Sequence, residues 1–125
     1  MASKHMGIAL LVPVLALAGT PFASAHAQLK SSYPAKNEVL SVAPKSAWLL
    51  FNEEILTLDG KAKNFLYVMN SKRQRVDLRE FRVEKSKISV NLKGNLKPGK
   101  YQLRYRVVSA DGHALQGSIG FTYKP

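Results

Sequence analysis

The chain has 125 residues, 46% of them hydrophobic, and it carries a formal net charge of +11 at pH 7 with no cysteine. This length allows one domain with a modest core. The lack of cysteine excludes disulfides, zinc fingers, iron–sulfur clusters and blue-copper centres, which all need thiolates. The fold must therefore be held by burial and backbone pairing.

The first 25 residues have the layout of a secretory signal peptide. Lys4 supplies a positive start, residues 8–18 form an apolar run, and residues 23–25 read Ala-Ser-Ala, the small-residue pattern that signal peptidase cleaves. The run is shorter than the about 20 residues that a membrane span needs. We therefore expect export, cleavage after Ala25 and a mature domain of residues 26–125.

Beyond residue 25 the chain shows short runs of alternating apolar and polar residues, separated by turn residues, and no helical stripe. About seven strands at this spacing predict an all-β Greek-key β-sandwich or barrel of cupredoxin-like or immunoglobulin-like kind. Apolar residues on both faces predict a central strand at 47–52, and charge predicts an edge strand at 76–83. Trp48 is interpreted as a core residue. The predicted strands are 29–33, 47–52, 64–69, 76–83, 88–92, 101–108 and 119–123.

The basic residues of the mature chain are expected to be scattered over the surface rather than stacked on one face, Lys72, Arg79 and Lys97 among them. A net charge of this size is typical of nucleic-acid binding. An exported protein rarely meets nucleic acid, however, so we expect no such partner. We favour a solvated basic surface or attraction to anionic membrane lipids.

The three histidines have unequal weight. His5 lies in residues 1–6, whose sequence Met-Ala-Ser-Lys-His-Met is typical of a cloning remnant, and it is given no functional role. Cleavage after Ala25 would make His26 the first residue. An N-terminal His can close its α-amine and its ring nitrogen on one metal ion, which a histidine inside a chain cannot do.

The other mature histidine, His113, follows Asp111 and Gly112. In an extended backbone, residues two apart project to the same side, so the carboxylate and the imidazole can aim at one point while Gly112 lets another backbone approach closely. If the first strand docks beside the end of strand 101–108, His26 completes the site. Three nitrogens and one oxygen are the tetragonal set that Cu(II) prefers.

Other interpretations stay open at this point. Asp-Gly is also the strongest short hairpin signal, so Asp111 and Gly112 can equally form a plain turn with His113 exposed beside it. Glu53 either orients a ligand imidazole through its other nitrogen or is an ordinary strand-end carboxylate. Nucleophilic catalysis is disfavoured because the chain has no Gly-x-Ser-x-Gly elbow.

Three segments carry a resemblance to a known family. They are residues 103–113 with Gly117 and Phe121 after them, the strand residues 50–53, and the turn residues 96–101. Together with a mature chain that begins with His, they resemble the signature of the CopC family of periplasmic copper-binding proteins. The likeness spans residues 26–125.

The resemblance implies a monomeric periplasmic protein that binds one Cu(II) per chain through His26, Asp111 and His113, in copper resistance or uptake and without catalysis. It also implies a membrane partner of the CopD type. Met69 is the only methionine after the leader, so the methionine-rich Cu(I) site of some members is not expected. The alternatives are a histidine-brace copper oxidase or monooxygenase, and a metal-free immunoglobulin-like interaction module.

Overall fold

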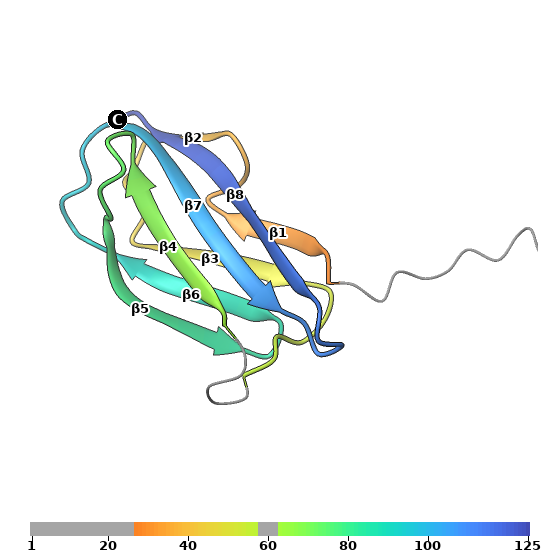
Figure 1. Ribbon diagram of the computed structural model, residues 1–125. Helices are drawn as coiled ribbons and strands as arrows, with labels where there is room; N and C mark the ends of the chain where they lie inside the picture. Colours follow the sequence, from red (N-terminus) through yellow and green to blue (C-terminus); the bar gives the residue numbers. More distant parts are fainter. Residues whose placement is uncertain (1–26, 58–62) are drawn as a thin grey trace, which may run out of the picture.

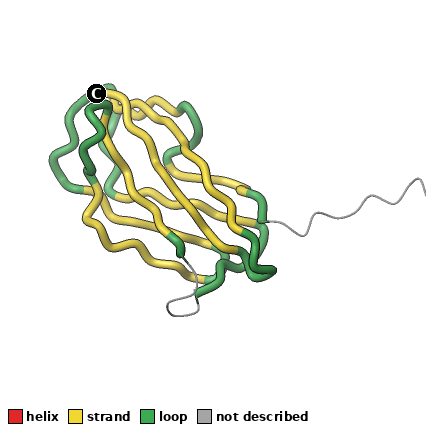
Figure 2. Tube along the Cα trace, viewed as in Figure 1, coloured by secondary structure: helices red, strands yellow, loops and turns green. Residues whose placement is uncertain are grey.

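The computed structural model describes residues 27–57 and 63–125. Within these two ranges the chain forms eight strands in two four-stranded sheets that lie face to face (Figures 1 and 2). The described ranges contain no helix that is long and apolar enough to cross a membrane. The strands are β1 (Leu29–Tyr33), β2 (Glu38–Leu40), β3 (Ser46–Phe51), β4 (Phe65–Asn70), β5 (Asp77–Glu84), β6 (Lys87–Leu92), β7 (Gly99–Val108) and β8 (Ala114–Tyr123).

The predicted all-β sandwich is confirmed, and so are the places of two strands within it. One sheet has the order β1-β3-β6-β5, so β3 is central and β5 lies at an edge. The other has the order β2-β8-β7-β4. The sequence missed β2, because it has three residues and its middle side chain, Val39, is 61% exposed. Parallel pairing with the distant β8 holds it in place, and no local pattern signals such a pairing.

The core follows from strict alternation along the strands. Every second residue of β7, from Tyr101 to Val107, is buried between the sheets. Each side chain of this size contributes about 1.5–3 kcal/mol when fully buried. The ring of Tyr105 leaves no room for a side chain at position 117, because a Cβ on Gly117 would lie 2.7 Å from the Tyr105 hydroxyl oxygen. Gly117 is therefore required by packing.

The prediction that Trp48 belongs to the core is wrong. Its neighbours Ala47 and Leu49 take the inward positions of β3, so the period of two turns Trp48 to the outer face, where it is only half-buried. There it stacks on Tyr33 with ring centroids 6.5 Å apart, and the ammonium of Lys87 lies 5.0 Å from the ring centroid.

A buried carboxylate ties the two sheets together at one edge. Asp77, at the start of β5, is 1% exposed and accepts hydrogen bonds from the backbone N–H groups of Val68 in the other sheet, at 3.1 Å, and of Arg79, at 3.0 Å. The guanidinium of Arg75 binds both carboxylate oxygens, at 3.1 and 2.7 Å. Burial alone would raise the pKa of Asp77, but these donors outweigh it and lower the pKa below its ordinary value.

We expect Asp77→Ala to destabilise the fold by about 2–4 kcal/mol at pH 7, because it leaves buried N–H groups without an acceptor. Because the folded-state pKa is lowered, the contribution of the carboxylate is present above pH 3.8 and is lost as pH falls through the folded-state value. Urea unfolding of both proteins at pH 7 and near pH 3 measures this. Glu80→Ala, at an exposed position of β5, is the control. Equal stability of wild type and Asp77→Ala at pH 7 would contradict the role.

Candidate metal centre

The turn between β7 and β8 contains two of the three predicted metal ligands. Gly112 has φ 88°, and its N–H donates to the carbonyl of Ser109 at 2.8 Å. The backbone is thus a tight turn, and the prediction that Asp111 and His113 share a side through an extended backbone is wrong. A Cβ on Gly112 would meet nothing within 4 Å. The glycine therefore supplies the left-handed backbone, not room for another chain.

The turn nevertheless brings the carboxylate and the imidazole together. Oδ2 of Asp111 lies 3.2 Å from Nδ1 of His113, and the backbone N–H of His113 donates to Oδ1 of Asp111 at 3.1 Å. Their side chains are 25% and 61% exposed, respectively. A carboxylate oxygen and an imidazole thus stand side by side at the surface, where a metal ion can reach them from water.

Ser109 holds the carboxylate of Asp111 in place, a role that the sequence did not lead us to predict. The residue is 1% exposed, and its hydroxyl donates to Oδ1 of Asp111. This hydrogen bond, followed by the one from the His113 N–H, lowers the pKa of Asp111 to about 2. The carboxylate is therefore ionised at every ordinary pH, as a metal ligand must be. The signal in the sequence was a hydroxyl residue two positions before Asp-Gly, a spacing that allows such a local bond.

The first described residues lie at the same end of the sandwich as this turn (Figure 1). Ala27 is 6% exposed and belongs to the core. Gln28 is held by Asn52, which follows β3: its N–H donates to Oδ1 of Asn52 at 2.7 Å, and its carbonyl accepts from the Asn52 N–H at 3.0 Å. These contacts fix the path of the chain from Ala27 onwards, one residue after the predicted start of the mature chain.

The same stretch after β3 also holds the turn. The N–H of Ala110 donates to the carbonyl of Glu54 at 3.0 Å, and Ile55 forms an isolated bridge with Ser109. The predicted arrangement in which the first strand docks beside strand 101–108 is wrong, because β1 lies in the other sheet and pairs with β3. The link between the first residues and the turn instead runs through the four residues after β3, 52–55.

The remaining predicted site residues have different outcomes. His26 lies outside the described residues. In the described ranges, no group of three or more His, Asp or Glu side chains is close enough to hold a metal ion, so Asp111 and His113 stand there as a pair. Glu53 is half-buried, and within those ranges no hydrogen bond or ion pair joins it to His113. Its role as an orienting group stays a prediction.

Fold and turn together define a small two-sheet β-protein with a carboxylate–imidazole pair in its last hairpin. The CopC domain family matches residues 29–124, and the chain therefore belongs to this family. It is 32% identical over 111 residues to the protein YobA of Escherichia coli K12, covering 84% of each chain. It is 34% identical over 125 residues to the copper transport protein CutJ of Bacillus subtilis, covering 98% of this chain and 22% of CutJ.

Solved structures agree on the fold. PcoC, a methionine-rich copper resistance protein from Escherichia coli, superposes with a TM-score of 0.59 at 26% identity, covering 80% of this chain and all of PcoC. CopC from Methylosinus trichosporium OB3b gives a TM-score of 0.69 at 22% identity, covering 80% of this chain and 95% of the other. At that identity the second likeness concerns the fold alone.

We expect Ser109→Ala to raise the pKa of Asp111 from about 2 towards its ordinary value of 3.8, because the hydrogen bond that lowers this pKa most is removed. Titration of the carboxyl carbon by NMR measures the change. Ser118→Ala, at an exposed position of β8, is the matched control and should leave the pKa of Asp111 unchanged. An unaltered titration in Ser109→Ala would show that the serine does not hold the carboxylate.

Proposed function

We propose that this chain binds one Cu(II) ion per molecule in the periplasm and holds or hands on the ion in copper homeostasis. The proposed ligands are the α-amine and ring of His26, the carboxylate of Asp111 and the imidazole of His113. The observation that carries the proposal is the contact between Asp111 and His113 in the last hairpin of a chain of the CopC family. The similarity to CutJ, a copper transport protein, and to PcoC, a copper resistance protein, supports it.

The donor chemistry favours copper over other divalent ions. The chain offers imidazole and carboxylate groups and no thiolate. Mg²⁺ and Ca²⁺ prefer sites built of oxygen alone. Among first-row divalent ions, Cu(II) binds such nitrogen and oxygen ligands most tightly. The hydrogen bond from Ser109 supports the site further, because it keeps the carboxylate ionised and oriented before the ion arrives.

The position of Gln28 supports the participation of His26. Gln28 bonds to Asn52, and Ala110, beside Asp111, bonds to Glu54, two residues further along the same stretch. Two extended residues span about 7 Å. We infer that the first mature residue, two positions before Gln28, extends from there towards the turn and brings its amine and ring to the carboxylate and the imidazole.

We infer that copper is cargo and that the chain performs no catalytic turnover. A carboxylate ligand from Asp111 would occupy a coordination position that an oxygen-activating copper centre keeps open. The recipient that we propose is an inner-membrane protein of the CopD type, with this chain acting as a monomer. Cleavage after Ala25 during export is a necessary part of the proposal, because it creates the α-amine of His26.

We expect His113→Ala, or a chain that retains Ala25, to bind Cu(II) about 100-fold or more weakly than the chain that begins at His26, because each loses a nitrogen donor. Competition with a chromophoric chelator measures the affinity, and electron paramagnetic resonance counts the nitrogen donors. Gln116→Ala, at an exposed position of β8, should bind as the wild type does. Equal affinity with Ala25 retained would reject the amine as a ligand.

Copper affinity should fall as pH is lowered from 8 to 5, because the α-amine, with an ordinary pKa of about 7.7–8.0, must lose its proton to bind the ion. The carboxylate adds nothing to this slope, since the pKa of Asp111 is about 2. Asp111→Asn should therefore lower the affinity at every pH in this range and leave the slope unchanged. Chelator competition at several pH values measures both. A flatter slope in Asp111→Asn would contradict the assignment.

A further inference from the structure

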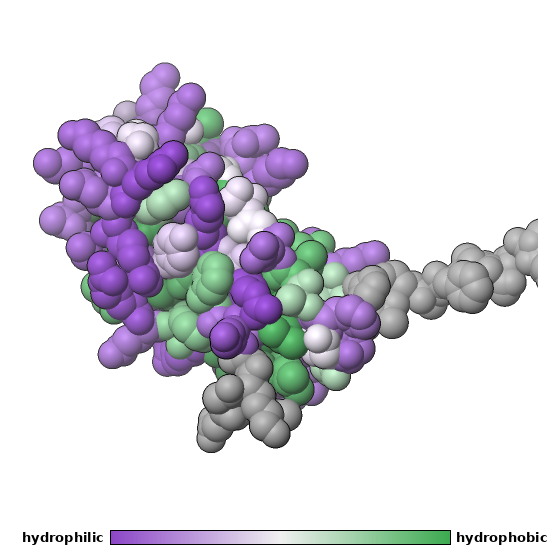
Figure 3. Space-filling model, viewed as in Figure 1, coloured by the Kyte–Doolittle hydropathy of each residue, from purple (hydrophilic) through white to green (hydrophobic). Residues whose placement is uncertain are grey.

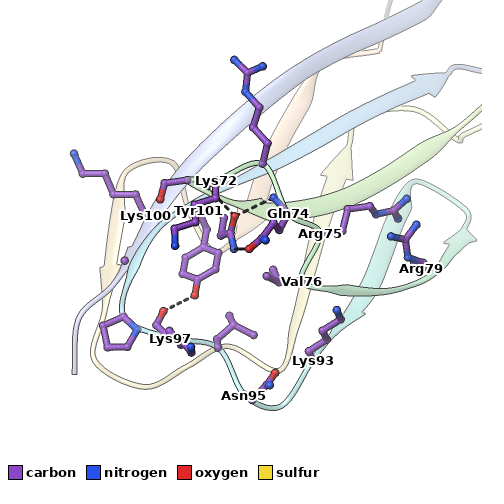
Figure 4. Close-up of a pocket in the computed structure, with 16 residues that line it drawn as sticks. Lys72, Gln74, Arg75, Val76, Arg79, Lys93, Asn95, Lys97, Lys100 and Tyr101 are labelled. Atoms are coloured by element: carbon purple, nitrogen blue, oxygen red, sulfur yellow. Dashed lines mark hydrogen bonds between the residues drawn. The ribbon is translucent and has the colours of Figure 1, made fainter.

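A cationic groove lies at the end of the sandwich opposite the turn between β7 and β8, which holds Asp111 and His113 and is the proposed metal-binding turn. It has a volume of about 970 Å³ and is formed by the β4–β5 turn and the β6–β7 loop, with the start of β7 behind them (Figure 4). Of its 16 lining residues, seven carry a positive charge and none carries a negative charge. The seven are Lys72, Arg73, Arg75, Arg79, Lys93, Lys97 and Lys100.

The expectation that the basic residues are scattered is wrong for these seven, although Lys36, Lys45 and Lys87 do not line the groove. The β4–β5 turn and the β6–β7 loop both connect one sheet to the other, so they meet at the same end of the sandwich. Figure 3 shows hydrophilic side chains gathered at this end. Asp77 lies behind the groove, but it is buried and already bonded to Arg75. The field inside the groove is therefore strongly positive.

Two of the lining arginines sit where the backbone disfavours them. Arg73 and Arg79 have φ values of 63° and 67°, in the left-handed region that Gly and Asn adopt more readily. The backbone hydrogen bonds explain the left-handed turns, since the N–H of Arg73 donates to the Asn70 carbonyl and that of Arg79 donates to Asp77. These hydrogen bonds do not explain why both positions carry arginine rather than glycine or asparagine. Residues held in such conformations cluster at functional sites.

The walls of the groove are ordered before any ligand binds. The carboxamide oxygen of Asn70 accepts the N–H groups of Lys72 and Gln74, at 2.9 and 3.0 Å, which fixes the β4–β5 turn. The hydroxyl of Tyr101 donates to the carbonyl of Lys97, which ties the β6–β7 loop to β7 (Figure 4). Binding of a ligand therefore does not have to order these two loops, and this lower entropic cost favours affinity.

We propose that this groove binds a compact anion with two or more clustered phosphate groups, either free in solution or displayed on a lipid headgroup. Guanidinium and ammonium groups are the side chains that bind phosphate most strongly. A recessed site with seven cations suits several negative charges close together better than one, and its concave shape suits a compact group better than a flat surface. β7 spans the ten residues Gly99–Val108 between this groove and the metal-binding turn, about 30 Å. The proposal is therefore independent of the copper site.

The test compares two double variants of equal charge. Arg73→Asn with Arg79→Asn removes two cations from the groove, and Asn tolerates the left-handed backbone, so the melting temperature should not fall. Lys30→Gln with Arg82→Gln removes two exposed cations outside the groove. Calorimetric titration of the mature chain without added copper, with inorganic triphosphate, should show binding that the groove variant weakens about tenfold or more and the control does not.

Vesicles distinguish the two sources of phosphate. Preferential binding to cardiolipin over phosphatidylglycerol vesicles of equal surface charge, lost in the groove variant, assigns the site to a headgroup with clustered phosphates. Binding of triphosphate alone assigns it to a soluble anion. Equal losses of binding in the groove variant and the control variant would show that the overall positive charge of the protein, and not the groove, attracts the anion. That result would overturn the proposal. So would the absence of binding to both triphosphate and cardiolipin.

Discussion

The proposed copper site depends on the four residues that follow β3. Asn52 donates its backbone N–H to Gln28 and accepts the Gln28 N–H at its side-chain oxygen, while the carbonyl of Glu54 accepts the N–H of Ala110. Because both partners are tied to the same stretch, two segments more than 80 positions apart in the sequence lie at one end of the sandwich.

The turn between β7 and β8, which holds the proposed ligands Asp111 and His113, combines local rigidity with exposure. Ser109 is buried and Asp111 is held by it, while His113 remains largely in contact with water. An ion pair this exposed contributes little to stability, since water screens it. The hydrogen bonds within the turn therefore serve to orient a carboxylate rather than to hold the fold together. The fold depends instead on the core and on buried links such as Asp77.

Charge is distributed unevenly between the two ends of the molecule. The cationic groove and the carboxylate–imidazole pair are separated by about the length of β7, roughly 30 Å. At physiological ionic strength the screening length is about 8 Å. The lysines and arginines of the groove therefore do not repel a cupric ion at the turn, although the whole chain is strongly basic. The two proposed sites would therefore bind ions of opposite charge without interfering with each other.

Local patterns in the sequence determined much of this protein. Alternation predicted most of the strands, charge predicted the edge position of β5, and the scarcity of histidine together with the two-residue spacing pointed to Asp111 and His113. The tertiary structure decided what depends on distant residues: the parallel pairing that forms β2, the outward position of Trp48, the link from Gln28 to the turn through residues 52–55 and the collection of seven cations in one groove. The physical reason is that periodicity reports only which side of a strand a residue occupies, whereas pairing across the sheets decides which strands, and which charges, become neighbours.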